Sequence, residues 1–485
     1  MLWVVLSGLL ATNLLFTVFV VALPQVARGL HTTVSTMTWT VTGPMLAFGV
    51  VAPLAGKSGD LFGHRRLFLL GVGLEVVVAA LSASAPSASV LIAARVLGGV
   101  VGASIGAASM ALVLSVFDKA DRVKALGFWS LVGAGGPVIG VAVGGPVIEY
   151  IGWRWMFILQ MPLLALSGLL AVAVLPARAE GRRLLASGRP QIDWAGAASI
   201  AICVGAFLTA LNRGPAWGWS SAGVLTAFAV SLVAGCSFVA AERRAAEPVF
   251  PLHYLRRRNF AFPIAAQTFS NFAYIGAFFL APLLLFRVYG YGASAAGFLV
   301  LPRPIVFSLI APVAGYVTVK IGERTSAVVG TTAVVASMGA FALAGRSSGL
   351  ALVEVAFVLS GIGLGVGQPP LSASVANEFA AEDLGAASAS QQLMNQIGTV
   401  AGIQVMQTVQ VASAHGRVGP GSLPSFHAAY VVGGAVAVLG IVAAAMTRST
   451  DRRSTPTIDM AEALEMGERQ PVVQTGATSL ERALP

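Results

Sequence analysis

Charged residues are scarce in this sequence. Asp, Glu, Lys and Arg make up only 10% of its 485 residues, whereas an ordinary soluble domain carries roughly 25%. Hydrophobic residues account for 56% of the chain, and its mean hydropathy is +0.82. Because a core surrounded by water cannot take up that much apolar surface, the composition excludes an ordinary soluble protein. It indicates a chain embedded in a lipid bilayer.

Residues that usually carry catalysis or bind metals are also few. Cys203 and Cys236 both lie in apolar stretches and lack the paired spacing of a metal site or a disulfide framework. The five histidines are dispersed along the chain, so we expect no membrane enzyme, no metal and no cofactor. A nucleotide-binding phosphate loop is missing, which argues against ATP-driven pumping. The net charge of +10 comes from scattered basic residues, so we do not expect nucleic-acid binding.

Long apolar runs are the main feature that is present. A membrane-spanning helix needs about 20 mostly apolar residues. On that basis we expect an all-α membrane protein with fourteen transmembrane helices, in the order six, two, six. The predicted spans are residues 2–24, 37–56, 67–85, 89–115, 125–148, 155–176, 194–212, 221–241, 261–285, 294–318, 326–345, 351–373, 387–410 and 426–446. The first run lacks a cleavage site, so we interpret it as a membrane helix rather than a signal peptide.

These spans divide the chain into four predicted segments. They are an N-terminal half (1–176), an inserted two-helix segment with its linkers (177–259), a C-terminal half (260–446) and a polar tail (447–485). We expect the tail to be a disordered cytoplasmic segment, because it has too few apolar residues to build a core.

The basic residues between spans favour one orientation. Most of them fall on one set of alternate loops, and cytoplasmic loops are enriched in Lys and Arg. We therefore expect both termini to be cytoplasmic, in a multi-pass protein of the plasma or inner membrane. The basic residues on this side are Lys57, Arg65, Arg66, Lys119, Arg122, Lys124, Arg178, Arg182, Arg183, Arg189, Arg243, Arg244, Arg256, Arg257, Arg258, Lys320 and Arg324.

A short motif occurs twice. The sequence reads GKSGDLFGHRR after the second predicted span and GYVTVKIGER after the tenth. Each copy lies between the second and third spans of its six-span block, which indicates a duplicated transporter half. Three positions coincide in the two copies: Gly56 with Gly315, Gly63 with Gly322, and Arg65 with Arg324.

The motifs resemble those of the major facilitator superfamily, and specifically of its fourteen-helix drug:proton antiporter family, up to about residue 446. The first copy of the repeat is similar to the signature loop of that family. The fourth and fifth spans carry two further similar motifs: Arg95-Val96-Leu97-Gly98-Gly99 followed by Gly102 and Ala103, and Gly136-Pro137-Val138-Ile139-Gly140 followed by Gly144, Gly145 and Trp153-Arg154-Trp155.

This resemblance implies a function. The family fold has two pseudo-symmetric halves that rock about a central site. We therefore expect a monomeric secondary transporter that exports amphipathic small molecules, such as drugs, antibiotics or natural products of the host cell. The resemblance implies exchange for protons, with the proton gradient as the energy source. A dedicated exporter of a lipid or of a single metabolite remains the alternative.

Two sets of residues are implied in gating. By the resemblance, Asp60 faces a helix N-terminus of the other half, where the helix dipole favours an anion, and holds the cytoplasmic gate shut beside the arginines. The stripe on the fifth span lies between the halves in this family, although plain tight packing accounts for its glycines equally well. For Arg66 the alternative is a purely topogenic charge. The gating candidates are Gly56, Asp60, Gly63, Arg65, Arg66, Gly136, Pro137, Gly140, Gly144 and Gly145.

Four ionisable residues within spans are candidates for proton coupling: Glu75, Arg95, Arg303 and Glu354. An arginine in a span is expensive and normally faces a cavity or a partner. Equal depth on two antiparallel helices suggests an ion pair of Glu75 with Arg95, unless Glu75 packs peripherally. Glu354 is the better candidate for a proton or cation site, unless it pairs with Arg346 at the outer interface.

Neutral polar side chains on the first, ninth and thirteenth spans suit a cavity for amphipathic ligands, because they orient a ligand without a large desolvation cost. Hydrogen bonds between helices are the alternative for each of them. The candidates are Asn13, Thr17, Gln267, Asn271, Tyr274, Gln391, Gln392, Asn395 and Gln396.

The chain departs from the family pattern at four positions. Val141 stands where the family often has a second proline on the fifth span. Leu15 stands where many relatives have an aspartate on the first span, and Val20 where they have an asparagine. Val319 replaces the acid in the second copy of the signature loop. Proton coupling, where it exists, must then use Glu75, Glu354, a histidine such as His427, or a proton of the substrate.

Overall fold

The computed structural model describes residues 1–37, 39–119, 121–175, 193–245, 252–345, 350–380, 383–414 and 419–448. Most of the loop predicted between the sixth and seventh spans and nearly all of the predicted tail lie outside this set, so the expectation of disorder in the tail is not addressed by it.

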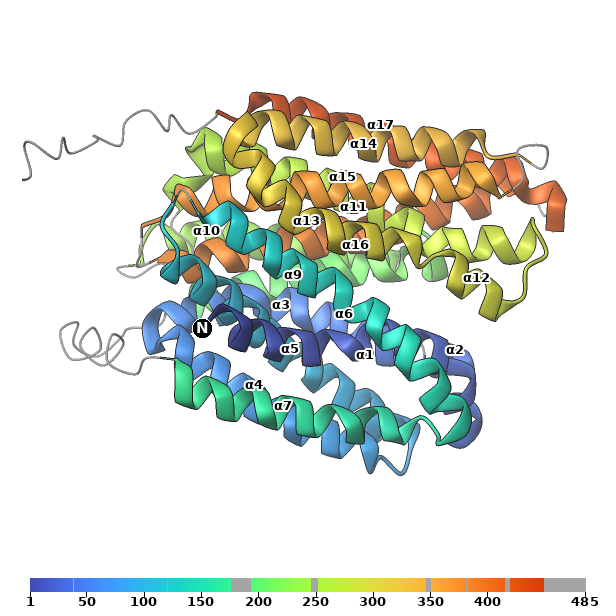
Figure 1. Cartoon of the computed structure of the whole chain (residues 1–485), viewed down its shortest axis with the longest axis horizontal. Helices are drawn as coiled ribbons and strands as arrows, with labels where there is room; N and C mark the ends of the chain where they lie inside the picture. The colour runs from blue at the N-terminus through green and yellow to red at the C-terminus, as the bar shows by residue number, and fades with distance from the viewer. Residues whose placement is uncertain are drawn as a thin grey trace, which may run out of the picture. The chain divides into compact units, whose positions relative to one another are not determined.

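The described chain is helical, and fourteen of its helices have at least 20 residues. Their order matches the six, two, six prediction (Figure 1). The first block consists of α1 (Leu2–Gly29), α3 (Trp39–Phe62), α4 (His64–Ala83), α5 (Ala88–Val116), α6 (Arg122–Tyr150) and α7 (Arg154–Val174). The inserted pair consists of α9 (Trp194–Trp217) and α10 (Ala222–Glu242). The second block consists of α11 (Arg258–Arg287), α13 (Pro302–Ile321), α14 (Glu323–Leu343), α15 (Ala351–Asn377), α16 (Leu384–Ala414) and α17 (Leu423–Met446).

Twelve of the helices in the described part of the chain are long and apolar enough to cross a membrane. The other two long helices are α1 and α16. In α1 the apolar stretch Leu2–Leu14 is shorter than a full span, and α16 carries many glutamines. Short helices complete the set: α2 (Val34–Met37), η1 (Leu252–Arg256), α12 (Ala293–Leu299) and η3 (Gly419–Ser422).

The tenth predicted span differs from the prediction of one continuous helix. It is built from the short α12 and the longer α13, which begins at Pro302. Proline has no N–H to continue a helix, and it disfavours the helical conformation of the residue before it. Pro302 and Pro304 therefore place a helix start inside the apolar run, with Arg303 at that start.

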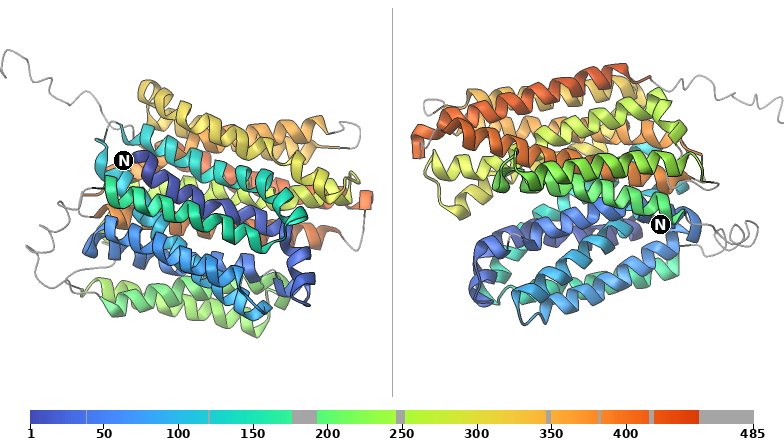
Figure 2. Two further views of the ribbon diagram at one scale, coloured as in Figure 1. Left: turned by 60° about the horizontal axis from the view of Figure 1, so that its bottom comes forward. Right: turned by 180° about the vertical axis from the view of Figure 1, so that it is seen from behind.

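The two blocks meet along four main helices. α3 packs against α16, and α6 packs against α13, while α5 also touches α16 and α15 touches α6. Within each block the peripheral helices α4 and α7, or α14 and α17, pack against each other and against the inner ones. Figure 2 shows these helices from two further sides. Segments far apart in the sequence thus form the seam between the blocks.

The inserted pair lies beside this seam. α9 packs against α10 and also contacts α3 of the first block and α16 of the second. Leu208 of α9 is fully buried and lies next to Gly49 of α3. In the turn after α9, the indole N–H of Trp219 donates to the hydroxyl of Thr408 on α16 at 3.2 Å. The pair therefore touches both blocks.

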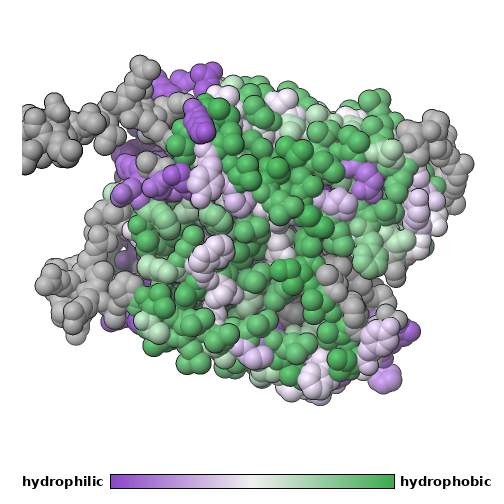
Figure 3. All heavy atoms as spheres, in the orientation of Figure 1, coloured by the Kyte–Doolittle hydropathy of each residue, from purple (hydrophilic) through white to green (hydrophobic). Residues whose placement is uncertain are grey.

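The outward surface suits lipid. Figure 3 shows apolar residues over most of one face, with hydrophilic residues gathered mainly at the end where the N-terminus lies. On α4, Leu70, Leu74 and Val77 are all more than half exposed, at 65%, 53% and 53%. Because such a belt is stable only in a bilayer, the chain is a multi-pass membrane protein.

Candidate gating site

The repeated motif is a repeat of backbone structure as well as of sequence. Gly63 precedes α4 with φ of 97°, and Gly322 precedes α14 with φ of 90°. Only glycine adopts such angles without strain. Each glycine therefore permits the sharp turn between the second and third long helices of its block.

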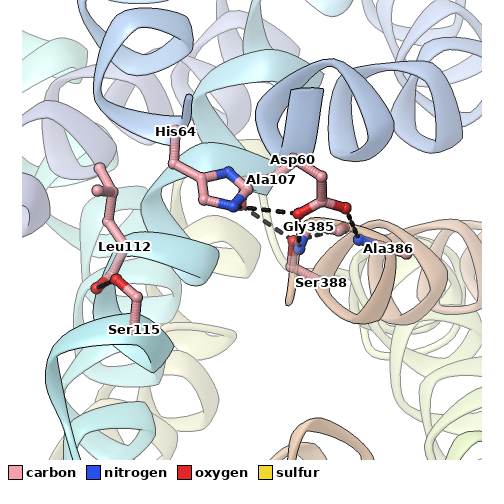
Figure 4. A network of polar contacts seen from close by, with 8 residues as sticks. All are labelled: Asp60, His64, Ala107, Leu112, Ser115, Gly385, Ala386 and Ser388. Carbon is pink, nitrogen blue, oxygen red and sulfur yellow. Dashed lines mark hydrogen bonds and ion pairs between the residues drawn. The ribbon is translucent and has the colours of Figure 1, made fainter. Parts of the chain in front are cut away.

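Asp60, near the end of α3, contacts the start of α16 in the other block. The backbone N–H of Gly385 donates to its Oδ1 at 2.7 Å, and the N–H of Ala386 donates to its Oδ2 at 3.0 Å (Figure 4). The first N–H groups of a helix have no partner within the helix, and they carry the positive end of its dipole. One carboxylate thus holds the N-terminus of a helix from the other block, as the resemblance implied.

Two glycines let the helices come close enough for this contact. A Cβ added to Gly56 would lie 2.4 Å from the carbonyl oxygen of Gly385 and 2.4 Å from the Cβ of Ala389. A Cβ added to Gly385 would lie 2.3 Å from the carbonyl oxygen of Gly56. Both distances are far below van der Waals contact, so α3 and α16 touch backbone to backbone here. The sequence drew attention to Gly56 but gave no signal for Gly385.

The charges around Asp60 differ from the prediction. The Nε2 of His64 lies 3.2 Å from the Oδ1 of Asp60 (Figure 4). The guanidinium of Arg65 instead donates to the carbonyl oxygens of Leu175 at 2.8 Å and Val172 at 3.1 Å. Arg65 therefore ties the loop to the end of α7, while Arg66 is exposed. The turn at Gly63 directs His64 toward the carboxylate, and this residue was not among the predicted gating residues.

The second copy of the motif forms a similar close contact without an acid. A Cβ on Gly315 of α13 would lie 2.9 Å from the Cα of Lys124 on α6, and one on Gly127 of α6 would lie 2.7 Å from the carbonyl oxygen of Ala311. The two helices thus also meet backbone to backbone. With Val319 at the position of the acid, this close contact has no counterpart of Asp60.

Comparison with known proteins agrees with this geometry. Residues 5–403 match the sequence profile of the Major Facilitator Superfamily. The chain belongs to this superfamily.

Its relatives within the superfamily include export proteins. The chain is 30% identical over 414 residues to the tetracenomycin C resistance and export protein of Streptomyces glaucescens, an alignment that covers 85% of this chain and 76% of that protein. It is 29% identical over 415 residues to the multidrug resistance protein Stp of Mycobacterium tuberculosis, covering 84% and 76%.

A solved structure shows the same fold. The proton:xylose symporter XylE, bound to 6-bromo-6-deoxy-D-glucose, superposes with a TM-score of 0.64 at 13% identity. The superposition covers 90% of this chain and 94% of that one. The paired six-helix blocks are therefore those of a major facilitator.

Two of the ionisable candidates of this major facilitator lie in the first block. Glu75 of α4 is buried, and the nearby charge that acts on it is Arg95 of α5. The Nε of Arg95 donates to the carbonyl oxygen of Thr40 at 3.4 Å, and its guanidinium lies 5.9 Å from the ring centre of Phe157. The predicted ion pair of Glu75 with Arg95 stays a prediction.

The other two ionisable candidates lie apart in the second block. Arg303 is fully buried; its guanidinium lies 3.4 Å from the ring centre of Tyr274 and donates to the carbonyl oxygen of that residue. Glu354, at the start of α15, is half-buried, and its Oε1 has no hydrogen-bond partner among the described residues. Arg346, its alternative partner, lies outside them.

The glycines of α6 point in two directions. A Cβ on Gly136 would lie 3.1 Å from the Cβ of Asn13 on α1, within the same block, whereas one on Gly135 would lie 3.4 Å from the hydroxyl of Ser308 on α13. Gly127 and Gly135, rather than Gly136, thus face the other block. Gly140 is buried. The surroundings of Pro137, Gly144, Gly145, Leu15, Thr17 and Val20 lie outside the described set.

The polar candidates for a substrate cavity bond mainly to protein groups in this conformation. Asn13 donates to the carbonyl oxygen of Leu9 in its own helix, and Gln392 lies against Gly106 of α5. The candidates that bond to another helix are Gln267 to Ser372, Asn271 to Asn395, Gln391 to Ser372 and Gln396 to Met45. A cavity of about 10 Å³ beside Gln267 and Asn271 holds at most one water. Gln267, Asn271, Gln391 and Gln396 therefore link neighbouring helices in this conformation.

Proposed function

We propose that this chain is a secondary active transporter that exports amphipathic small molecules from the cell by alternating access. The observation that carries the proposal is the contact of Asp60 with the N-terminus of α16. It joins the two blocks at one end by a bond that a rocking motion can break and remake. The similarity to proteins named for resistance and export supports the direction of transport.

The proposed orientation places this gate at the cytoplasmic face. The signature loop and its second copy carry Lys57, Arg65, Arg66, Lys320 and Arg324, and cytoplasmic loops are enriched in basic residues. With the gate closed, the contacts at Asp60 shut the cytoplasmic path. Release of Asp60 from α16 then opens the binding region to substrate from the cytoplasm.

The proposed substrates are largely apolar compounds with few charges. Asn271, Asn395 and Gln396 of the inner helices are neutral, and in this conformation they satisfy one another or a nearby backbone group. Rocking of the blocks changes the contacts between α3 and α16, which include the bond of Gln396 with Met45, and this change frees amide groups for a ligand. Neutral amides in apolar surroundings bind such ligands without a buried charge.

Exchange with protons is proposed to use a carboxylate outside the first helix. Glu354 fits best, because its Oε1 is buried without a hydrogen bond among the described residues. Glu75, beside Arg95, is the second candidate.

The test is transport in proteoliposomes with a pH-sensitive dye inside, an imposed pH gradient and a panel of amphipathic dyes and antibiotics. We expect flux of several compounds with proton movement in the opposite direction, and loss of proton movement in Glu354→Gln. Flux of a single compound would indicate a dedicated exporter instead. Two results together would refute the proposal. No compound of the panel would be transported, and the flux through Asp60→Asn would equal that through the unmodified protein.

A further inference from the structure

A second residue joins the two blocks at the same end of the molecule. Arg122 is the first residue of α6, and its side chain is buried at 8% exposure. Its Nη1 donates to the carbonyl oxygen of Ala376 and to the Oδ1 of Asn377, both at 3.2 Å, at the end of α15. Its Nε donates to the carbonyl oxygen of Leu114 in the first block at 3.1 Å. One guanidinium thus connects α5, α6 and α15.

The end of α15 offers oxygen atoms that accept hydrogen bonds from a cationic side chain. The last carbonyl groups of a helix have no partner within it, and they carry the negative end of the dipole. Hydrogen bonds from an arginine to such groups are charge-assisted and stronger than those between neutral groups. A buried arginine without these acceptors would be unfavourable, so the position of Arg122 depends on α15 staying close.

Arg122 and Asp60 act on adjacent helix ends with opposite charges. α15 ends at Asn377, and α16 begins at Leu384. Arg122 contacts the negative end of α15, and Asp60 contacts the positive end of α16. Both charged side chains come from the first block, and both helix ends belong to the second.

The loop between α15 and α16 is held from its own side as well. The ring of Tyr254 stacks on Phe379 at 3.9 Å between ring centres, and its hydroxyl donates to Asp383 at 3.1 Å. Burial raises the pKa of Tyr254, so the hydroxyl remains a donor. Arg257 donates to the carbonyl oxygen of Glu378 at 2.7 Å. These contacts connect both helix ends to η1 and the start of α11.

We propose that Arg122 is a second latch residue of the gate, which holds the C-terminus of α15 while Asp60 holds the N-terminus of α16. The inference rests on the proposed alternating access. Arg122 is a positioning residue: it sets the balance between the closed and open states of this face and does not contact the substrate. The rival role is purely structural, with Arg122 serving only to tie α6 to Leu114.

The test measures the distance across the gate directly, without transport. Spin labels are attached to cysteines at Val174 of α7 and Thr325 of α14, both exposed at the ends of peripheral helices, with Cys203 and Cys236 replaced by serine. In liposomes, pulsed electron paramagnetic resonance gives the ratio of long to short distances. We expect Arg122→Ala to raise this ratio about tenfold, as expected for lost hydrogen bonds to a charged group.

Matched variants separate the latch from a general loss of structure. Arg243→Ala removes an exposed arginine that lies outside the repeated motif and is assigned to the same side of the membrane, and it should leave the ratio unchanged. Asn377→Ala should raise the ratio less than Arg122→Ala, and the double variant should equal Arg122→Ala alone. Arg122→Lys should give an intermediate ratio. These two milder variants keep the test valid where Arg122→Ala folds poorly.

The outcomes distinguish this inference from the proposed function. A shift in Asp60→Asn, with distances in Arg122→Ala and Asn377→Ala like those of the unmodified protein, would overturn the role of Arg122 and leave the gate intact. Unchanged distances in all three variants would overturn the latch as a whole, whereas export of substrate is measured separately in the flux assay.

Discussion

At the scale of single residues, the gate depends on charges placed at helix ends. The carboxylate of Asp60 accepts hydrogen bonds from backbone groups 325 residues further along the chain. His64 adds a polar partner four residues away along the chain. The carboxylate needs no Lys or Arg side chain from the second block as its partner, because the first N–H groups of α16 supply the positive charge. A single carboxylate is therefore sufficient for a contact between the two blocks that can form and break during transport.

Asp60→Asn should weaken this bond while keeping the size of the side chain. The amide has one acceptor oxygen instead of two charged ones, and a hydrogen bond to a charged group contributes about 1.5–3 kcal/mol. We expect the rate of export to fall about tenfold or more, measured as dye flux in proteoliposomes. Asp121→Asn is the control, since Asp121 pairs with Lys124 on an exposed surface and should change the rate little.

At the scale of helices, small residues decide which surfaces touch. α3 and α16 meet at Gly56 and Gly385, and α6 and α13 meet at Gly127 and Gly315. In a membrane, where apolar helices gain nothing from avoiding water, close packing of backbones is a main source of attraction between helices. At both of these close approaches, a glycine from each block lets the helix backbones come near one another.

Gly385→Ala should separate α3 from α16. The added methyl would lie 2.3 Å from the carbonyl oxygen of Gly56, so the helices must move apart and Asp60 loses its N–H donors. We expect export to be nearly abolished, with the protein still folded by its melting temperature in detergent. Gly73→Ala is the matched control, because a Cβ on Gly73 of α4 meets no atom within 4 Å. Equal activity of the two variants would contradict the close-contact argument.

The inserted pair is also attached through particular side chains. Leu208 of α9 is fully buried beside α3, whereas Leu232 of α10 is 71% exposed. Leu208→Ala should reduce stability by about 2–4 kcal/mol, since a buried leucine loses its contacts and leaves a cavity. Leu232→Ala should have little effect, because it removes no packing. Thermal unfolding in detergent compares the two variants, and similar melting temperatures would show that α9 is not packed as described.

At the scale of the whole molecule, the closed end and the inserted pair set limits on movement. Both latch contacts lie at the end that carries the signature loop, while α9 touches α3 and α16 on one side of the seam. Separation of the blocks at the gate must therefore change the contacts of α9 with at least one of its two neighbours.

A covalent link across the gate should stop transport. Lys119, in the loop before α6, and Ala380, in the loop after α15, are both exposed and lie three residues from Arg122 and Asn377. Cysteines at these positions, joined by a short cleavable reagent, should hold the gate closed and block export. Reduction of the linker should restore it. Continued export by the linked protein would contradict alternating access at this face.

Much of this protein follows from its sequence alone. The membrane location and the order of the long helices were predicted, because hydropathy is a local property. The sequence also showed that Gly63 and Gly322 occupy equivalent positions of the repeated motif, and the structure adds that both have a positive φ. The break before α13 is also local, yet the apolar run concealed it. The contact of Asp60 with a helix N-terminus was implied by the resemblance.

Only the tertiary structure identified the partners. Gly385 has no signal of its own among many glycines, and Arg122 reads as one more basic loop residue until α15 lies beside it. Arg65 turns to the end of α7, and the polar residues of α11 and α16 bond to one another. These contacts join residues more than 100 positions apart, and which helices meet is decided by the packing of the whole bundle rather than by any local pattern.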